Sequence, residues 1–327
     1  MPNFMSRNHK KHAVIGNAHN VLPPPARAYR PPPHRPRFRS AEEGSSTVPA
    51  TTPSGAPPAI ALRGVTKQFA TEDGTPYTAL RDLDITVRPG EFCAVVGPTG
   101  CGKSTTLTLV SGLDRPSAGS VEVHGKPVTS IAPGVAFMFQ TDAILPWKTV
   151  LDNVSAGPRF RGASKRKAFD DARDWIRRVG LSGFEGRYPH QLSGGMRKRV
   201  ALAQNLINEP EILLMDEPFS ALDVQTRAKM SGELLGLWEL TRPAVVFVTH
   251  DLEEAIALAD SVVVLTAGPA ATVKARFAID LPRPRVVQEI RFEPEFVDLY
   301  HEIWEALRAE VDVAYSQTTQ LTGTEER

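Results

Sequence analysis

The chain has 327 residues, 41% hydrophobic and 23% charged, so its composition is that of a globular protein. Its 38 basic and 37 acidic residues leave a net charge of +1, which argues against a nucleic-acid partner. The two cysteines, Cys93 and Cys101, have no partner at metal-ligand spacing, so neither a disulfide framework nor a zinc site is expected. This cysteine usage suits a reducing cytosol. No apolar run reaches the ~20 residues that a membrane span needs, so another polypeptide must supply any spans.

Residues 1–58 contain twelve prolines, with eight Lys or Arg against two Asp or Glu. Such a segment cannot bury enough apolar surface to offset the entropy of ordering it. We therefore expect a disordered, basic, Pro-rich extension over 1–58. It is either an unstructured addition or an arm for interactions.

From residue 59 the pattern changes to short apolar strands. Ile60–Phe69 and Ala79–Val87 are separated by a turn, and they predict an antiparallel β part at the beginning of the domain. Further strands are expected at Glu91–Val96, Ser120–Val123, Val135–Phe139, Ile212–Met215, Val245–Val248 and Val262–Leu265. Because helices lie between several of these apolar strands, we predict an α/β domain over 59–285 with a mostly parallel sheet.

Two helical regions complete the predicted organisation. Residues from about 145 to 208 are expected to form an inserted helical subdomain, with helices at Ala163–Val179 and Gly194–Asn208. Near the C-terminus, apolar residues recur at spacings of three and four and predict an amphipathic helix over Pro294–Glu310. That helix and the tail after it make a last segment, 286–327.

A phosphate-binding loop is the clearest chemical motif. The octapeptide from Gly97 to Ser104 fits G-x-x-x-x-G-K-[ST], follows an apolar strand and opens a helix from about Lys103 to Gly112, which predicts a phosphate-loop NTPase core. Lys103 is expected to reach the β- and γ-phosphates, and the Ser104 hydroxyl to ligate Mg²⁺. The expected ATP-binding residues here are Gly97, Pro98, Thr99, Gly100, Cys101, Gly102, Lys103, Ser104 and Thr105. Because Cys101 lies near a helix N-terminus and a lysine, we also expect a lowered thiol pKa and inhibition by thiol reagents.

A second apolar strand, Ile212–Met215, ends in two carboxylates, Asp216 and Glu217. In open α/β sheets such strand ends lie at the ligand-binding edge. Asp216 is expected to hold Mg²⁺, and Glu217 is the candidate general base for an attacking water.

Between these motifs lies Leu192-Ser193-Gly194-Gly195-Met196, a turn that opens a helix and offers a hydroxyl and free N–H groups to an anion. With it, the chain over about 60–270 resembles the ABC ATPase family. Gln140 resembles the Q-loop glutamine, and His250 the switch histidine. Ser220–Asp223 resembles the D-loop. Phe69 lies where this family stacks an aromatic ring on adenine.

The resemblance implies a composite site shared by two copies of the chain in a head-to-tail, ATP-dependent dimer. One copy would supply the catalytic residues Glu217, His250 and Gln140, with Ser104, Gln140 and Asp216 as metal ligands. The other copy would supply Ser193, Gly194 and Gly195. ATP and Mg²⁺ are the implied cofactors.

Residues 141–154, with Leu145-Pro146-Trp147 and Asp152-Asn153-Val154, resemble importer ATPases of the nitrate/sulfonate/taurine class, as do Cys101 and Ile279–Arg285. This implies ATP-driven uptake of small anions through a transmembrane permease subunit, with a periplasmic or lipid-anchored binding protein. The implied location is the cytoplasmic face of the inner membrane. Gln204-Asn205 departs from the Arg-Ala of many members. An exporter or lipid-trafficking ATPase and a soluble ABC protein remain alternatives, and the motifs do not name the solute.

Overall fold

The computed structural model describes residues 57–71 and 74–322. The extension expected over 1–58 therefore lies outside the described residues, apart from its last two positions. Among the described residues, no helix has both the length and the apolar character required to span a bilayer.

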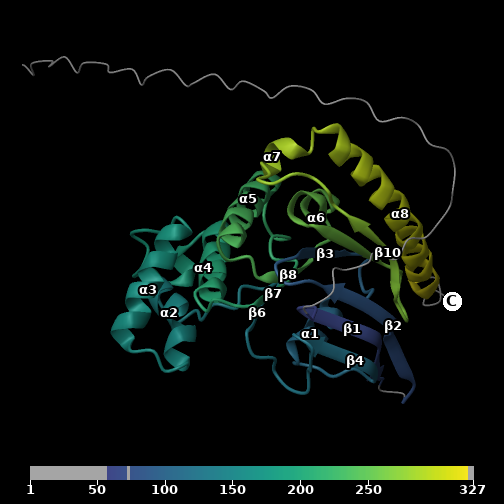
Figure 1. Cartoon of the computed structure of the whole chain (residues 1–327), viewed down its shortest axis with the longest axis horizontal. Helices are drawn as coiled ribbons and strands as arrows, with labels where there is room; N and C mark the ends of the chain where they lie inside the picture. Colours follow the sequence, from purple (N-terminus) through teal and green to yellow (C-terminus); the bar gives the residue numbers. More distant parts are fainter. Residues whose placement is uncertain (1–56, 72–73, 323–327) are drawn as a thin grey trace, which may run out of the picture. The chain divides into compact units, whose positions relative to one another are not determined.

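A six-stranded sheet has the order β10-β9-β3-β8-β7-β6 (Figure 1). Its strands are β3 (Phe92–Val96), β6 (Val135–Met138), β7 (Ile212–Asp216), β8 (Ala244–Val248), β9 (Ser261–Leu265) and β10 (Val273–Ala278). The strands from β9 to β6 are parallel, and β10 runs antiparallel to β9. The predicted parallel sheet is confirmed, while β10 was not among the predicted strands.

The central strands are apolar throughout because both faces of the sheet are covered. Every residue of β3, β8 and β9 is buried. Side chains alternate between the faces of a strand. On β3, Cys93 and Val95 accordingly join one core, while Phe92, Ala94 and Val96 join the other.

The core that contains Cys93 and Val95 lies between the large sheet and a second, antiparallel sheet of order β2-β1-β4-β5. The strands of this second sheet are β1 (Ile60–Ala70), β2 (Pro76–Val87), β4 (Ala118–Val123) and β5 (Lys126–Pro127). Helix α1 (Lys103–Ser111) contacts strands of both sheets and contributes Leu107, Leu109 and Val110 to their shared core. The predicted antiparallel β part is therefore confirmed.

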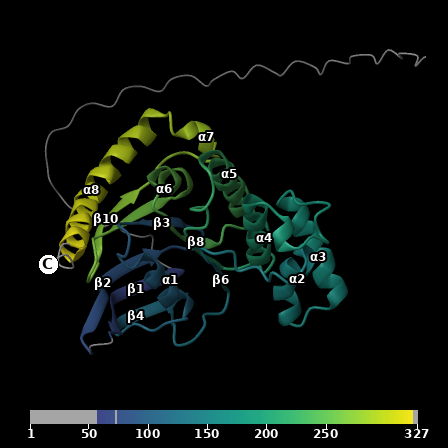
Figure 2. The same cartoon turned by 180° about the vertical axis from the view of Figure 1, so that it is seen from behind.

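The chain between β6 and β7 forms the inserted helical region. Its elements are α2 (Val150–Phe160), α3 (Lys165–Arg178), the 3-10 helix η1 (Pro189–Gln191) and α4 (Gly194–Leu206). Figures 1 and 2 show α2, α3 and α4 grouped beyond the edge of the sheet formed by β6. Helix α2 was not predicted. A Cβ atom on Gly157 of α2 would clash with the end of the Asn208 side chain, so a larger residue there would require Asn208 to move.

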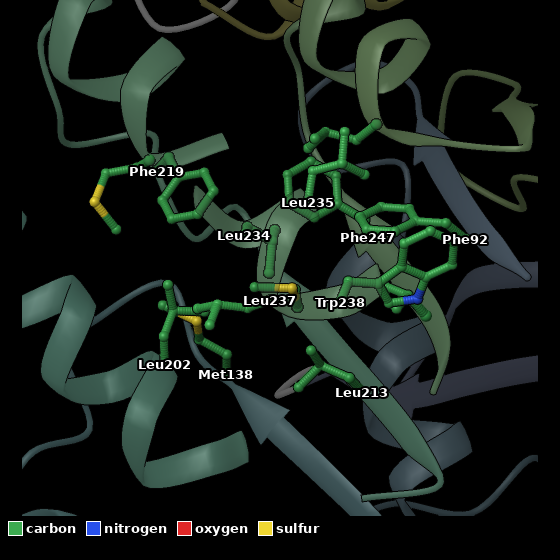
Figure 3. Close-up of a cluster of buried hydrophobic side chains, with 14 of the residues drawn as sticks. Phe92, Met138, Leu202, Leu213, Phe219, Leu234, Leu235, Leu237, Trp238 and Phe247 are labelled. Atoms are coloured by element: carbon green, nitrogen blue, oxygen red, sulfur yellow. The ribbon is translucent and has the colours of Figure 1, made fainter. Parts of the chain in front are cut away.

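The second core lies under helices α5 (Val224–Thr241) and α6 (Leu252–Leu258). Figure 3 shows its aromatic centre, where Phe92 of β3 meets Trp238 of α5 edge to face with ring centroids 5.5 Å apart. Phe247 of β8 packs beside Phe92, with centroids 5.8 Å apart. Aromatic pairs prefer such tilted contacts. This packing fixes α5, which begins at the predicted D-loop, against the strands that carry the candidate site.

After β10 the chain forms the short helix α7 (Val287–Ile290) and the long helix α8 (Pro294–Thr322). Helix α8 begins at the predicted residue but continues beyond Glu310. It buries Phe296, Ile303 and Leu307 and contacts α6, β9 and β10.

Candidate functional site

The phosphate loop joins β3 to α1. Gly100 and Gly102 have φ angles of 78° and 92°, a left-handed backbone that side chains rarely tolerate. Gly102 is the N-cap of α1, and that helix has neither a side-chain cap nor an acidic residue in its first turn. Its first N–H groups are therefore available to an anion.

Lys103 lies inside this loop rather than on the surface. Its side chain is buried, and its ammonium group donates to the carbonyl oxygens of Gly97 and Pro98, each at 2.9 Å. A buried ammonium group held only by neutral carbonyls still favours an anionic ligand. The loop therefore presents a positive charge and the helix N–H groups at one place, as a phosphate site requires.

Asp216, the last residue of β7, meets the beginning of α1. The Ser104 hydroxyl donates to Asp216 Oδ1 at 3.0 Å. Burial raises the pKa of Asp216, and the hydrogen bond from Ser104 partly offsets this. A buried carboxylate beside a hydroxyl is stabilised by a nearby cation. Within 57–71 and 74–322, no group of three or more His, Cys, Asp or Glu residues is arranged to hold a metal ion. The pair instead suits Mg²⁺, which typically takes one or two carboxylates and completes its shell with phosphate and water.

Three side chains from the ends of neighbouring strands meet at one carboxylate oxygen. Glu217 Oε2 lies 3.3 Å from Gln140 Nε2 and 3.3 Å from His250 Nδ1. The three residues follow β7, β6 and β8, which are adjacent in the sheet. Parallel strands end at the same edge of a sheet. This brings Gln140, 77 residues before Glu217, and His250, 33 residues after it, to the same place.

The backbone at Glu217 holds this arrangement. Its φ angle is +42°, and its N–H donates to the carbonyl of Val248 at 2.9 Å. A left-handed backbone at a residue with a long side chain is uncommon and costs of order 1 kcal/mol, so the surrounding structure must hold it. The turn directs the carboxylate toward the residues that follow β6 and β8.

The predicted signature residues form the beginning of α4. Ser193 is its N-cap and accepts a hydrogen bond from the N–H of Met196 at 3.3 Å, as the sequence predicted. Gly194 and Gly195 are the first two helical residues and are only partly buried. Within the described parts of the chain, no hydrogen bond or ion pair joins these three residues to the phosphate loop.

The structure also reveals a link that sequence reasoning missed. Lys198 of α4 is buried and donates to the carbonyl of Gln140 at 2.8 Å. It also pairs with Asp142 at 2.9 Å, and so does Arg197. The signature helix is thereby joined to the segment that carries Gln140. Lys198 is a charged residue at a buried position of a predicted helix, and this could have indicated that it has a partner. The sequence did not point to Asp142 as that partner.

Phe69 lies near the end of β1 and remains 40% exposed, with Lys67 Nζ 4.8 Å from its ring centroid. An exposed ring backed by a cation can stack on a base. The predicted D-loop, Ser220–Asp223, precedes α5, and Asp223 is the N-cap of that helix. The Ser220 hydroxyl donates to the carbonyl of Glu217 at 3.0 Å, so the D-loop and the candidate base are directly connected.

The lowered pKa that was expected for the Cys101 thiol was wrong. The thiol is fully buried, and burial raises its pKa, an effect larger than the opposing attraction of Lys103. A Cβ atom on Gly97 would lie 2.8 Å from Cys101 Sγ, which shows how closely the loop packs around the sulfur. Cys101 therefore fills the loop and is not poised for reaction.

Comparison with known proteins agrees with this arrangement. A protein-family profile described as "ABC transporter" matches residues 80–220. An uncharacterised ABC transporter ATP-binding protein of Methanocaldococcus jannaschii is 44% identical over 252 residues, covering 77% of this chain and 92% of that relative. The chain belongs to the ABC transporter family. As an ABC ATP-binding protein it is an ATP-hydrolysing enzyme.

Two further relatives of this ABC ATPase have named solutes. Nitrate import ATP-binding protein NrtD of Synechococcus elongatus is 42% identical, covering 72% of this chain and 86% of the relative. Bicarbonate transport ATP-binding protein CmpD of the same organism is 41% identical, covering 75% and 88%. Among solved structures, a dimeric ATP-binding cassette in a post-hydrolysis state with ADP and Pi is similar, with a TM-score of 0.61 and 30% identity. That match covers 68% of this chain and all of the other.

Proposed function

We propose that this ABC ATPase powers an importer of small anions of the nitrate, bicarbonate, sulfonate or taurine kind. The similarity to NrtD and CmpD over nearly three quarters of the chain carries this proposal. The residues in and around Leu145-Pro146-Trp147 and Ile279–Arg285, which resemble the same class, support it.

In this proposal Glu217 is the general base. Its carboxylate accepts from Gln140 and lies beside His250, so both neighbours fix its direction and the carboxylate can take a proton from water. Lys103 and the N-terminus of α1 bind the phosphates. Ser104, Asp216 and the side-chain amide oxygen of Gln140 would hold Mg²⁺, which would supply charge neutralisation at the phosphates.

The site is completed by a second copy of the chain. Ser193, Gly194 and Gly195 open a helix whose N-terminus can bind an anion, yet they share no described hydrogen bond with their own phosphate loop. Solved cassettes of similar fold are dimeric. A head-to-tail dimer bound to MgATP would bring each signature turn to the γ-phosphate of the other copy, and hydrolysis would release it.

A groove on the helical region supports docking of a membrane permease. It has a volume of about 310 Å³ and lies between β6 and helices α2 and α4. Phe160, 86% exposed, and Phe139 line it beside Gln204 and Asn205. Exposed aromatic side chains around a concavity mark binding surfaces. A cytoplasmic helix of the permease would insert into this groove and hold the ATPase at the inner face of the membrane. Phe139 in the groove lining directly precedes Gln140, so the docked helix would lie next to the candidate site.

The test uses the purified chain and the Glu217→Gln variant. With MgATP the variant should bind nucleotide, lose hydrolysis by roughly 10²–10⁴-fold and remain dimeric in size exclusion with light scattering. Wild type should hydrolyse ATP and return to the monomer. A variant with the wild-type rate rules out Glu217 as the base.

The transported solute requires a cellular test. Deletion of the gene should abolish uptake of labelled nitrate, bicarbonate or taurine, and wild type should restore it whereas Glu217→Gln should not. If deletion instead raises the internal amount of a solute, the system is an exporter and the proposed direction of transport is wrong.

A further inference from the structure

The segment Ile279–Arg285 has a structural role that its resemblance to importer sequences does not explain. It follows β10 and passes beside the C-terminal end of α6. Its two arginines, Arg283 and Arg285, direct their guanidinium groups at backbone carbonyls there. Helix α6 is the helix that begins directly after the switch histidine, His250.

Arg285 is 7% exposed, and every one of its described hydrogen bonds goes to a backbone carbonyl. Nη1 donates to Ile256, Ala257 and Ala259 at 3.2, 3.2 and 2.7 Å. Nη2 and Nε donate to carbonyls of its own segment, at Ile279 and Leu281. One side chain therefore joins the last turn of α6 to the segment that carries Arg285.

Arg283 reinforces the same end of the helix. Its Nη2 donates to the carbonyl of Leu258 at 2.7 Å and to Asp260 Oδ1 at 2.8 Å. Its guanidinium carbon lies 4.5 Å from the ring centroid of Trp238 on α5. The position of Arg283 is thus fixed by an acidic partner and an aromatic ring, independently of Arg285.

These contacts suit the needs of a short helix. Helix α6 has seven residues, and its last turn has no basic residue of its own. The last four carbonyls of a helix lack partners within it, and a cation there also interacts favourably with the helix dipole. Burial lowers the pKa of Arg285 to about 10, so the group still carries its charge at neutral pH. The planar guanidinium carries five donors in a fixed geometry, against three on a lysine ammonium group, so it suits a cluster of several carbonyls.

The other end of α6 is joined rigidly to the switch histidine. Asp251, next to His250, is the N-cap and accepts from the N–H groups of Glu253 and Glu254 at 2.9 and 3.2 Å. Glu254, within α6, accepts from the Thr249 hydroxyl at 2.8 Å. Because these hydrogen bonds join the loop to the helix, a displacement of α6 is expected to displace His250 as well.

We propose that Arg285, assisted by Arg283, is a positioning residue for His250: it holds the far end of α6 so that the imidazole remains beside Glu217. The inference rests on the proposed role of His250 in hydrolysis. A shift of about 1 Å at a catalytic group can cost up to ~100-fold in rate, so a clamp at the end of this short helix affects the chemistry.

The test is a double-mutant cycle on the rate of ATP hydrolysis by the full chain. Single-turnover hydrolysis, with protein in excess over MgATP, keeps slow variants measurable. Arg285→Lys retains the positive charge but loses the planar guanidinium group with its five N–H donors. We expect a rate about tenfold lower with unchanged ATP affinity, and less than a twofold further loss when His250 is already Ala. Arg283→Lys should show the same dependence on His250 to a smaller degree.

Arg276→Gln is the matched control. Arg276 lies on β10 in the same C-terminal region and donates to the Thr86 carbonyl and to Glu91, with no described contact to α6. Its effect on the rate should be equal with His250 or Ala at position 250. Thermal unfolding of each variant shows which rate changes reflect loss of the fold, and if Arg285→Lys does not fold, the Arg283→Lys cycle decides.

The outcomes separate the two claims. If His250→Ala lowers the rate and the arginine effects remain undiminished in that background, the positioning role is wrong and the proposed site stands. If Arg285→Lys and Arg283→Lys leave the rate unchanged, the positioning role is also wrong. If His250→Ala itself has no effect, the proposed role of His250 fails and the inference fails with it.

Discussion

Two helices begin at Gly-rich turns, and their beginnings differ in charge. At α1 the turn is joined to Lys103, Ser104 and Asp216, in a packed and charged environment. At α4 the turn has a neutral Ser193 cap and two partly buried glycines. One chain therefore carries two unlike half-sites. One is equipped for phosphate, metal and a base, and the other offers only neutral donors.

Complementation between chains should give the largest effect. A Lys103→Ala chain lacks the first half-site, and a Ser193→Arg chain lacks the second. Each alone should be inactive. Because a mixed dimer has one intact composite site, an equal mixture should recover about a quarter of the wild-type ATPase rate if dimers form at random.

Ser164→Arg is the matched control for the second chain. Ser164 caps α3 in the same way as Ser193 caps α4, with its hydroxyl accepting from the N–H of Lys167 at 3.3 Å. This variant alone should keep the wild-type rate, since it loses only a helix cap worth about 1 kcal/mol. A mixture that stays inactive would mean that the two half-sites do not combine across chains.

Helix α6, which follows His250, should contribute a dependence of stability on pH. Burial raises the pKa of Glu254, near His250, from 4.5 to about 7. The folded chain therefore holds this proton more tightly than the unfolded chain. The resulting stability is complete below about pH 4.5 and is lost as the pH rises through 7, and its full size is on the order of 3 kcal/mol.

Glu254→Gln removes this titration and keeps one carbonyl oxygen as an acceptor where the hydroxyls of Thr249 and Ser231 donate to the two oxygens of Glu254. Between about pH 6 and pH 8 the wild type should lose about 1 kcal/mol more unfolding free energy than the variant. Urea unfolding at both pH values measures this difference. The exposed neighbour Glu253, changed to Gln, serves as the control, and an equal loss in wild type and Glu254→Gln would contradict the assignment.

The parts of both half-sites were predictable from sequence, but a connection between them was not. The phosphate loop, the carboxylates at the end of β7 and the Ser193 cap each depend on neighbouring residues, and local patterns identified them. The contact of Lys198 with Gln140 and Asp142 joins residues up to 58 positions apart and has no local pattern. The sequence could name the parts of the site but not this connection between them.

Missed elements have related physical causes. Strand β10 is an edge strand whose residues alternate between exposed and partly buried, so it lacks an apolar run. Helix α2 contains Gly157 and Pro158, which argue against a helix locally, although Gly157 permits its close packing near Asn208. Tertiary contacts decide both cases.

Binding of the adenine base should depend moderately on Phe69. Stacking of a base on an aromatic ring contributes about 1–3 kcal/mol, and this ring is only half-buried, so Phe69→Ala should raise the KM for ATP about fivefold. The turnover number should stay near that of the wild type because the ring contacts the base and takes no part in the hydrolysis step. Phe292→Ala, which removes an exposed aromatic ring in the C-terminal region, is the control. An unchanged KM would remove Phe69 from the nucleotide site.

The smallest effect is expected at Cys101, where the packed turn at α1 should protect the thiol. Burial raises its pKa and encloses the sulfur, so Ellman's reagent should neither react with the folded chain nor inhibit it.

The open turn at α4 should behave in the opposite way. A Ser193→Cys variant places a thiol at an exposed N-cap, where it should react readily. In the Glu217→Gln background, MgATP should slow that reaction because the dimer covers the turn. If Ellman's reagent instead inactivates the wild type rapidly and Cys101→Ala abolishes this effect, the α1 turn opens in solution. The two turns would then differ less in accessibility than their packing implies.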